Sequence, residues 1–381
     1  MYSISSYGDM IADRVRMDAY LTALRQNITP DSIVLDVGTG TGIFALLSCK
    51  FGARKVYAIE SSDAIEVARQ IADANNMLDR IEFIQARSTE VTLPERANLM
   101  ISDMRGVLPF FQHNIPAVID ARRRLLDPGA ILIPLRDELW ASIVEAPELR
   151  RRLDQWDEFF ALDHSLDHQA AKKLVANTWW KGRTSPSEHL TLPQQLATLD
   201  YTSVDNPNVF GDLKFSVTRS GTGHGISVWF DTLLAKDIGF SSGPESPEVT
   251  YGSAFFPWPQ PVAVTLGDVV QVSISADLVG EDYIWRWQTS ITRESDTRVA
   301  HFKQSTFLGS PLSLAHLRKR ADSYRGERNE AGEVDLLVLT LMDGTKTTAE
   351  IAAELLTRFP NRFTEFKDAL GHVADLAAKY Q

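Results

Sequence analysis

A glycine-rich turn between two apolar segments is the part of this chain whose residue types point most directly to chemistry. Residues 34–37 are an apolar run that leads into Gly38, Gly40 and Gly42, and the next apolar run ends on Glu60. Glycines let the backbone turn tightly and approach a ligand that any Cβ would exclude. An acid about 20 residues after such a turn usually accepts hydrogen bonds from ribose hydroxyls. The pattern therefore predicts a nucleoside-cofactor site.

The glycine spacing and the acid before it indicate which nucleoside binds. Dinucleotide sites use G-x-G-x-x-G, which seats a pyrophosphate on a helix N-terminus. This turn reads G-x-G-x-G, and Asp36 stands before it. A carboxylate repels a phosphate but attracts a cation such as the amino end of S-adenosylmethionine (SAM). The alternative, a chance glycine turn in another βα unit, is disfavoured by the paired acids. We expect SAM as cofactor and S-adenosylhomocysteine as product.

The segments around this turn alternate between short apolar strands and helical patterns. Such alternation predicts an α/β domain with a parallel, doubly wound sheet, over residues 1–138. The expected strands are 33–37, 55–60, 81–85, 97–102 and 130–134, and the expected helices include 8–26 and 114–126.

After about residue 140 the pattern changes to alternating apolar and polar residues between Gly, Pro and Asp turns. This predicts an antiparallel β-rich domain, residues 139–312. A helical stretch at 148–182 interrupts it, and its aromatic residues fit either an interface, such as a dimer arm, or the core. A third region, 313–381, has helical patterns with Thr347 or Thr348 as an N-cap. The expected strands of the β-rich domain are 217–219, 225–234, 262–266, 269–276, 283–292 and 301–306, and the aromatic residues of the helical stretch are Trp156, Phe159, Phe160, Trp179 and Trp180.

The composition limits the classes of partner. Of 381 residues, 44% are hydrophobic and 23% charged, as in a soluble globular protein of more than one domain. The net charge of −11 argues against nucleic acid as a partner; it suits a basic peptide or simply solubility. Cys49 is the single cysteine, so no internal disulfide can form. Without a membrane-length apolar run, a signal-peptide pattern or metal-ligand spacing, we expect a cytoplasmic protein with no metal and no membrane contact.

Several segments between residues 6 and 310 resemble the protein arginine methyltransferases. Residues 7–20 read Y-x-x-M-I-x-D-x-x-R-x-x-x-Y, similar to the family's H-x-x-M-L-x-D-x-x-R-T-x-x-Y. Residues 34–42 and 52–60 are similar to its SAM-binding motifs, and 101–106, 225–230 and 242–244 follow in the expected order. The resemblance implies a Rossmann-like SAM-dependent methyltransferase domain, then an antiparallel β-barrel whose arm, about 148–182, supports a homodimer.

The resemblance also implies roles for individual residues. Arg16 would bind the SAM carboxylate, Asp36 and Gly38 would lie near its amino end, and Glu60 would hold the ribose hydroxyls. Ser88 and Thr89 occupy the adenine-contacting stretch, where the family usually has a Val-Glu pair. The remaining expected cofactor contacts are Gly40, Gly42, Ser61 and Ser102.

The loop expected to hold the methyl acceptor, residues 102–112 (the acceptor loop), departs from the family pattern. The family's S-E-W-M-G-Y and a later glutamate clamp the substrate guanidinium, whereas this chain has Asp103 and Gln112. A guanidinium is a protonated, poor nucleophile, and two carboxylates can orient it and offset its charge. Aspartate is one methylene shorter than glutamate, and glutamine supplies no charge. The family's T-H-W segment reads Thr250-Tyr251-Gly252, so Tyr251 stands where the family has a histidine, as does Tyr7.

Arg105, two residues after Asp103, adds a cation to this loop. It would repel an approaching guanidinium or neutralise Asp103 by pairing with it, or else be an ordinary solvated loop arginine. If it faces the pocket, an anionic or neutral polar acceptor is expected. The expected catalytic residues are Asp103, Gln112, Arg105 and Tyr251, with His113 as a weaker candidate base.

The function expected is SAM-dependent methyl transfer to a nitrogen or oxygen of a peptide or specialised-metabolite acceptor, with Asp103 orienting or deprotonating it. The alternatives are true arginine N-methylation with an Asp/Gln clamp, and a SAM-binding scaffold that has lost catalysis. Residues 334–351 weakly resemble the helical modules with which peptide-modifying enzymes bind leader peptides. For this C-terminal module the favoured interpretation is a plain dimerisation or capping element.

Overall fold

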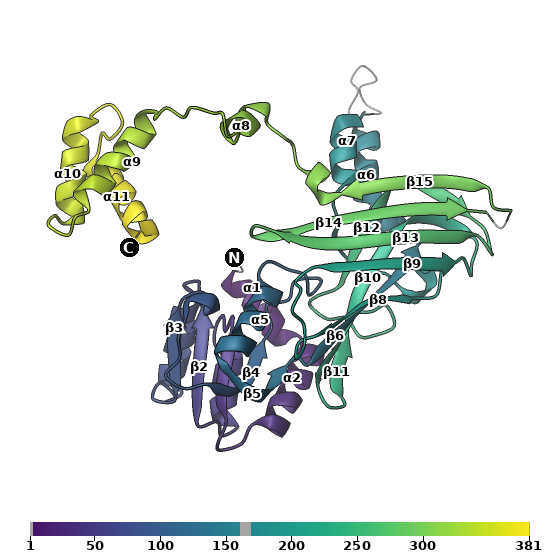
Figure 1. Ribbon diagram of the computed structural model, residues 1–381, viewed down its shortest axis with the longest axis horizontal. Helices are drawn as coiled ribbons and strands as arrows, with labels where there is room; N and C mark the ends of the chain where they lie inside the picture. The colour runs from purple at the N-terminus through teal and green to yellow at the C-terminus, as the bar shows by residue number, and fades with distance from the viewer. Residues whose placement is uncertain (1–2, 161–168, 294, 381) are drawn as a thin grey trace. The chain divides into compact units, whose positions relative to one another are not determined.

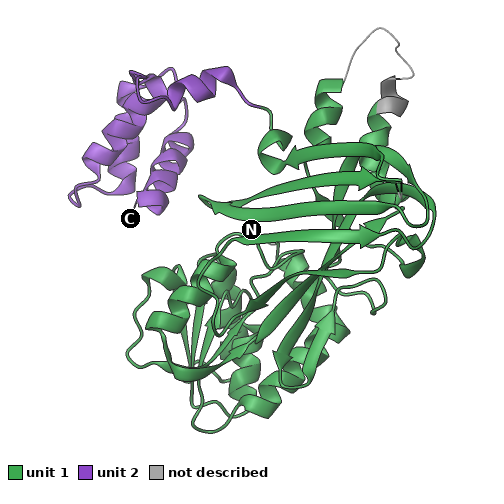
Figure 2. Cartoon of the chain, turned by 45° about the vertical axis from the view of Figure 1, so that its right-hand side comes forward, with its two compact units in different colours: residues 1–311 green, residues 312–381 purple. Residues whose placement is uncertain are grey.

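The computed structural model describes residues 3–160, 169–293 and 295–380, and the chain forms two compact units (Figures 1 and 2). Unit 1 comprises residues 1–311 and unit 2 residues 312–381. The expected boundary after residue 138 falls inside strand β6 (Arg136–Val144), so the α/β and β-rich regions share unit 1.

The α/β region is a five-stranded parallel sheet of order β3-β2-β1-β4-β5. The four strands expected between residues 33 and 102 are confirmed. The fifth begins at Leu126 rather than at 130, because Asp127-Pro128-Gly129 continues the strand instead of forming a separate turn. The elements are β1 (Ile33–Val37), β2 (Lys55–Glu60), β3 (Ile81–Gln85), β4 (Ala97–Ser102), β5 (Leu126–Ile133), α3 (Ile43–Lys50), α4 (Ala64–Ala74), α5 (Asn114–Arg124) and the 3₁₀ turn η1 (Ser88–Glu90).

The single helix expected at 8–26 is wrong: two helices, α1 (Ile4–Ala12) and α2 (Arg14–Asn27), meet at Asp13. Asp13 has an extended backbone, and its Oδ1 accepts a 3.0 Å hydrogen bond from the N–H of Arg16, which caps α2. Its Oδ2 accepts a 2.6 Å bond from the N–H of Thr250 in the β-rich region. Asp13 thus fixes the start of α2 against the second region of unit 1.

The β-rich region consists of two antiparallel sheets that share one hydrophobic core. These two sheets occupy the part of the chain where a β-barrel is expected, and within the described residues the strand pairing does not link them into one closed sheet. One sheet has the order β7-β12-β10-β6-β8 with β11 beside β10, and the other the order β15-β14-β13-β9. The strand expected at 217–219 is wrong, because Val217 makes only an isolated bridge to Thr191. The strands are β6, β7 (Trp180–Gly182), β8 (Gln194–Asp200), β9 (Val209–Ser216), β10 (Gly221–Ala235), β11 (Ile238–Ser241), β12 (Ser253–Val264), β13 (Val269–Val279), β14 (Asp282–Thr292) and β15 (Arg298–Ser305).

Helices α6 (Pro147–Phe160) and α7 (Gln169–Ala176) lie side by side at one end of the β-rich region (Figure 1). Trp180, next to them, is buried against Phe255 at 5.3 Å between ring centres. Trp179 packs on Phe256 and Trp285, so both tryptophans belong to the core. The side chains of Phe159 and Phe160 lie outside the described part.

Unit 2 contains α8 (Leu314–Lys319), α9 (Glu330–Leu341), α10 (Thr348–Arg358) and α11 (Phe366–Tyr380). Its own apolar core includes Val338, Leu355 and Val373. Thr347 is confirmed as an N-cap: it forms a capping box with Glu350 at the start of α10. In the described parts of both units, none of the helices has the length and apolar character needed to cross a bilayer.

Replacing the helix cap, Asp13→Ala, removes the acceptor for two backbone N–H groups, those of Arg16 and Thr250. We expect the free energy of unfolding to fall by about 1–2 kcal/mol in urea titration. The matched control is Asp18→Ala, an exposed acid on the same helix, which should change it by less than about 0.5 kcal/mol. Equal losses for the two variants would refute this role of Asp13.

Candidate functional site

The site lies at the carboxyl edge of the parallel sheet, where β1 and β4 are neighbours. In sheets of this kind ligands bind outside the carboxyl ends of the strands, where the strand order reverses. Val37, at the end of β1, pairs with Ile59 of β2 and with Ser102 of β4. The three segments that carry Asp36, Glu60 and Asp103 therefore end side by side.

Residues 38 and 40 of the turn must be glycine for two reasons: their backbone angles and the lack of room for a side chain. Gly38 and Gly40 have φ values of 74° and 55°, in the left-handed region that side chains disfavour. A Cβ on Gly38 would collide with the side chain of Met104, and one on Gly40 with the ring of Tyr7 from α1. The N-terminal helix and the acceptor loop thus both lie directly against this turn.

Asp36 is a buried carboxylate that is only half satisfied. It is 0% exposed, and its Oδ2 accepts a 2.6 Å hydrogen bond from the hydroxyl of Thr39. Its Oδ1 makes no hydrogen bond of normal geometry among the described residues. Burial raises the pKa of Asp36 to about 7; the Thr39 hydroxyl and the nearby backbone N–H of Ala45 oppose the shift, and the charge of Glu60 adds to it. Such a carboxylate suits a cationic ligand group.

Glu60 is held in place by the turn itself. Its Oε2 accepts a 3.0 Å bond from the N–H of Gly40, and its Oε1 a 2.9 Å bond from the N–H of Ser62. Each carboxylate oxygen keeps a further lone pair, which can accept from a hydroxyl. The ribose-binding role of Glu60 stays a prediction, and these bonds would fix its carboxylate for that role.

The expected serine and threonine contacts differ in exposure. Ser88 and Ser102 are buried, and the Ser102 hydroxyl has no partner among the described residues. Ser61 and Thr89 are exposed.

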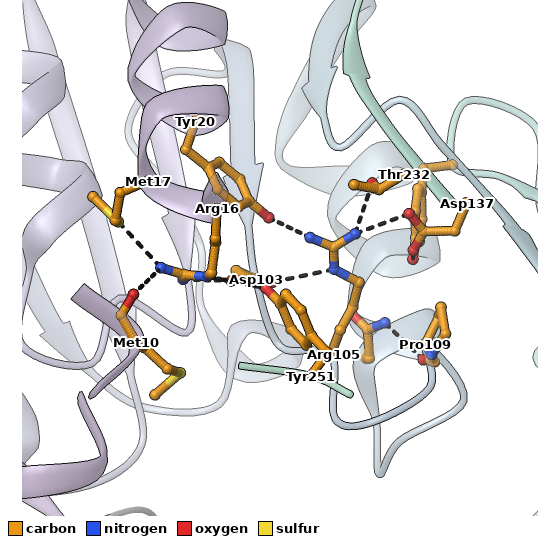
Figure 3. A network of polar contacts seen from close by, with 12 residues as sticks. Met10, Arg16, Met17, Tyr20, Asp103, Arg105, Pro109, Asp137, Thr232 and Tyr251 are labelled. Atoms are coloured by element: carbon orange, nitrogen blue, oxygen red, sulfur yellow. Dashed lines mark hydrogen bonds and ion pairs between the residues drawn. The ribbon is translucent and has the colours of Figure 1, made fainter. Parts of the chain in front are cut away.

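Asp103 sits between two arginines that approach it from opposite sides, as Figure 3 shows. Arg16 donates to Oδ2 through Nε, at 2.8 Å, and through Nη2. Arg105 donates to Oδ1 through Nε at 3.1 Å, and the hydroxyl oxygen of Tyr251 lies 2.7 Å and 2.6 Å from the two carboxylate oxygens. Burial acts in the opposite direction, but the two guanidinium groups and Tyr251 hold the pKa of Asp103 at about 2. Asp103 is therefore ionised and saturated with donors.

Arg16 extends from α2 and is buried, and its other N–H groups bond residues close to it in the sequence. Its Nη1 donates to the carbonyl oxygen of Met10 at 2.9 Å and lies 3.1 Å from the sulfur of Met17. The guanidinium also lies over the rings of Tyr20 and Phe44.

The interpretation of Arg105 as a solvated loop arginine is wrong. The residue is 4% exposed, and besides Asp103 its guanidinium bonds Asp137 at 2.9 Å, Thr232 at 2.8 Å and the hydroxyl of Tyr20 at 2.6 Å. Of the open alternatives, pairing with Asp103 is the one that the structure shows.

Of the other residues expected in the acceptor pocket, Tyr251 lies in the Asp103 network, whereas Gln112 and His113 lie outside it. Tyr251 is buried in the network and stacks on Phe240 at 5.8 Å. Gln112 is exposed, with a left-handed φ of 44°. The ring of His113 lies 3.1 Å from Glu281 at the tip of the β13–β14 hairpin, away from this network. The loop therefore presents one acid, not a pair of acceptors, to the site.

Sequence reasoning missed three members of this network: Tyr20, Asp137 and Thr232. Tyr20 belongs to the N-terminal pattern, which assigned it no role. Asp137, 0% exposed, also accepts a 2.7 Å bond from Tyr201. An acid between two charged neighbours at the start of a strand carries no sequence signal of burial, so only the fold identifies it.

Comparison with known proteins agrees with this geometry. A family model described as ribosomal protein L11 methyltransferase (PrmA) matches residues 18–104, and one described as the arginine methyltransferase oligomerization subdomain matches residues 136–282. Protein arginine N-methyltransferase 6 of Xenopus tropicalis is 29% identical over 289 residues, 73% of this chain and 83% of that protein. Protein arginine N-methyltransferase 1 of Schizosaccharomyces pombe is 28% identical over 70% of this chain and 80% of that protein.

A solved structure of Arabidopsis thaliana protein arginine methyltransferase 10 superposes with a TM-score of 0.69 at 25% identity, over 80% of this chain and 97% of that one. A Trypanosoma brucei enzyme–prozyme complex with AdoHcy has the same TM-score at 22% identity, over 78% of this chain and 96% of that one. The parallel sheet, the β-rich region that follows it and these relatives all point to one family. The chain belongs to the protein arginine N-methyltransferase family of SAM-dependent methyltransferases.

Proposed function

We propose that this protein transfers a methyl group from SAM to a nitrogen or oxygen of a neutral or anionic acceptor, on a peptide or a specialised metabolite, rather than to a standard guanidinium. The observation that carries the proposal is that the carboxylate of Asp103 is already paired with two arginines of the same chain. This residue stands where the family's first clamping glutamate is, and it is already bonded to Arg16 and Arg105.

The cofactor side of the site fits SAM. The unpartnered Oδ1 of Asp36 would receive the amino group and the oxygens of Glu60 the ribose hydroxyls. Arg16 would bind the carboxylate by exchanging one of its present bonds, such as that to the carbonyl oxygen of Met10. Bound SAM supplies a methyl group activated by a sulfonium. The remaining work of the protein is to position the acceptor and to exclude water.

The buried charges near Asp103 balance without a substrate. Arg16 and Arg105 carry two positive charges, Asp103 and Asp137 two negative ones, and all four side chains are at most 5% exposed. A guanidinium entering this group would lose its hydration and find no free carboxylate, which is strongly unfavourable. A neutral acceptor avoids that desolvation cost, and an anionic one would be attracted by any exposed guanidinium edge.

Asp103 is better suited to positioning than to proton abstraction. A carboxyl group whose pKa is about 2 is a weak base at neutral pH. Its bonds instead fix the orientation of Arg16 on the cofactor side and of the Tyr251 hydroxyl. We propose that these two groups, held by Asp103, shape the acceptor position.

Arginine methylation is the second candidate, because the relatives are named for it. It would require the Arg105 side chain to leave Asp103 before the acceptor guanidinium arrives. The two candidates differ in their product, so one assay separates them.

We also propose that the protein works as a cytoplasmic homodimer. The match of residues 136–282 to the oligomerization subdomain supports the dimer, and α6 and α7 lie within that range. The dimer and its location are open to direct measurement, for example by sedimentation and fractionation.

The pH dependence of cofactor affinity tests the role of Asp36. The raised pKa, about 7, means that this carboxyl is protonated below neutrality in the free protein. Binding a cation displaces that proton, so SAM affinity should rise about tenfold per pH unit up to about pH 7 in isothermal titration. Above about pH 8 it should fall again as the amino group of the cofactor loses its proton.

Asp36→Asn should remove the rise below pH 7 and weaken binding at pH 8 by about 10- to 100-fold. The control is Asp63→Asn, an exposed acid after β2 whose carboxylate accepts a 2.9 Å bond from the side chain of Gln85. It should keep the wild-type profile. A flat wild-type profile, or an unchanged one in Asp36→Asn, would contradict the assignment of Asp36 to the cofactor cation.

The acceptor class is tested by incubating the protein with labelled SAM and matched peptides that differ only in carrying arginine or its neutral isostere citrulline. Amide, hydroxyl and amine small molecules complete the acceptor set. We expect methyl incorporation into a neutral or anionic acceptor and no methylarginine by amino-acid analysis and mass spectrometry. Glu60→Gln, which weakens the ribose contact, is the background control. Methylarginine as the main product would refute the proposal in favour of the second candidate.

A further inference from the structure

Arg105 occupies a cage whose composition is that of a guanidinium receptor. Its charged end faces two carboxylates, Asp103 at 3.1 Å and Asp137 at 2.9 Å, and two hydroxyls, those of Thr232 and Tyr20. The planar guanidinium thus makes four hydrogen bonds to these four side chains.

Aromatic rings complete the cage around the same group. The guanidinium carbon lies 5.2 Å from the ring centre of Phe230, 5.7 Å from that of Phe240 and 5.4 Å from that of Tyr251. Rings at this distance attract a cation through their faces, more strongly where water is absent. The Arg105 side chain is 1% exposed, so this cage excludes water.

The walls of the cage come from segments far apart in the chain. Tyr20 is on α2, Asp137 on β6, Phe230 and Thr232 on β10, and Phe240 on β11. Strand β10 pairs with both β6 and β11, and α2 lies against β10 and β11. Because backbone pairing holds these strands together, we expect the cage to keep its shape when the Arg105 side chain is shortened.

We propose that Arg105 is a specificity-determining residue: it fills, with the chain's own guanidinium, a receptor that would otherwise accept a guanidinium from outside. Asp137 is the positioning residue that holds it there. The consequence for the acceptor rests on the proposed function, but the receptor itself is a binding property that can be measured without methyl transfer.

The test is rescue of Arg105→Ala by free guanidinium. The melting temperature of the full-length variant is followed with 0–20 mM guanidinium chloride, on the order of a hundredth of denaturing concentrations. Sodium chloride and urea at equal concentrations serve as ionic and shape controls. We expect Arg105→Ala to melt lower than wild type and to regain about 2–4 °C at ten times the dissociation constant of guanidinium, with no gain from urea.

Two control variants define the receptor. Arg105→Ala/Asp137→Asn lacks one carboxylate of the cage and should lose the rescue. Arg150→Ala removes an equally buried arginine that bonds the carbonyl oxygens of Trp258 and Pro259, and it should show a smaller regain. Equal rescue of Arg150→Ala, or rescue that survives the loss of Asp137, would overturn the proposal.

Absence of rescue in Arg105→Ala would also overturn it. If that variant does not fold alone, its refolded fraction by circular dichroism is compared in guanidinium and in sodium chloride at equal concentration. A higher fraction in guanidinium supports the receptor, and equal fractions contradict it. Failure here leaves the proposed neutral-acceptor chemistry standing, whereas methylarginine formation by the wild type overturns that chemistry whatever the rescue shows.

Discussion

The buried carboxylate of Asp103, bonded on both sides by guanidinium groups, is the interaction on which the rest of the site depends. It joins α2, through Arg16, to the acceptor loop, and through Arg105 to Asp137 of the β-rich region. Removing one member of such a buried network leaves an uncompensated charge, which typically costs about 3–5 kcal/mol. The two regions of unit 1 are thus tied together at the place where cofactor and acceptor would meet.

Two carboxylates at the same sheet edge have opposite environments. Asp36 is buried with one oxygen unpartnered, so its pKa rises to about 7; Asp103 is buried between cations, so its pKa falls to about 2. Asp36 has an oxygen available for a cationic group, whereas both oxygens of Asp103 already accept hydrogen bonds. On the proposed function, this asymmetry separates a cofactor side that needs a positive group from an acceptor side that would reject one.

The sequence predicted the parallel strands and the glycine turn well because their signals are local: apolar runs, glycine spacing and a terminal acid. It failed where structure depends on distant partners. Asp13, where the N-terminal helices break, also accepts a bond from distant Thr250. Strand β12 contains Pro257, Pro259 and Pro261, which are tolerated because its ladder with β10 is interrupted between Pro257 and Val262. The burial of Arg105 was equally out of reach, since Asp137, 32 residues later, supplies its counter-charge.

The central claim is that Asp103 stays bonded to Arg16 and Arg105 while the protein works. A crystal structure with S-adenosylhomocysteine and an arginine-containing peptide tests it most directly. The account predicts that both arginines still donate to Asp103 and that the peptide guanidinium makes no contact with this carboxylate. Arg105 displaced from its cage, with the peptide guanidinium on Asp103 in its place, would contradict the account.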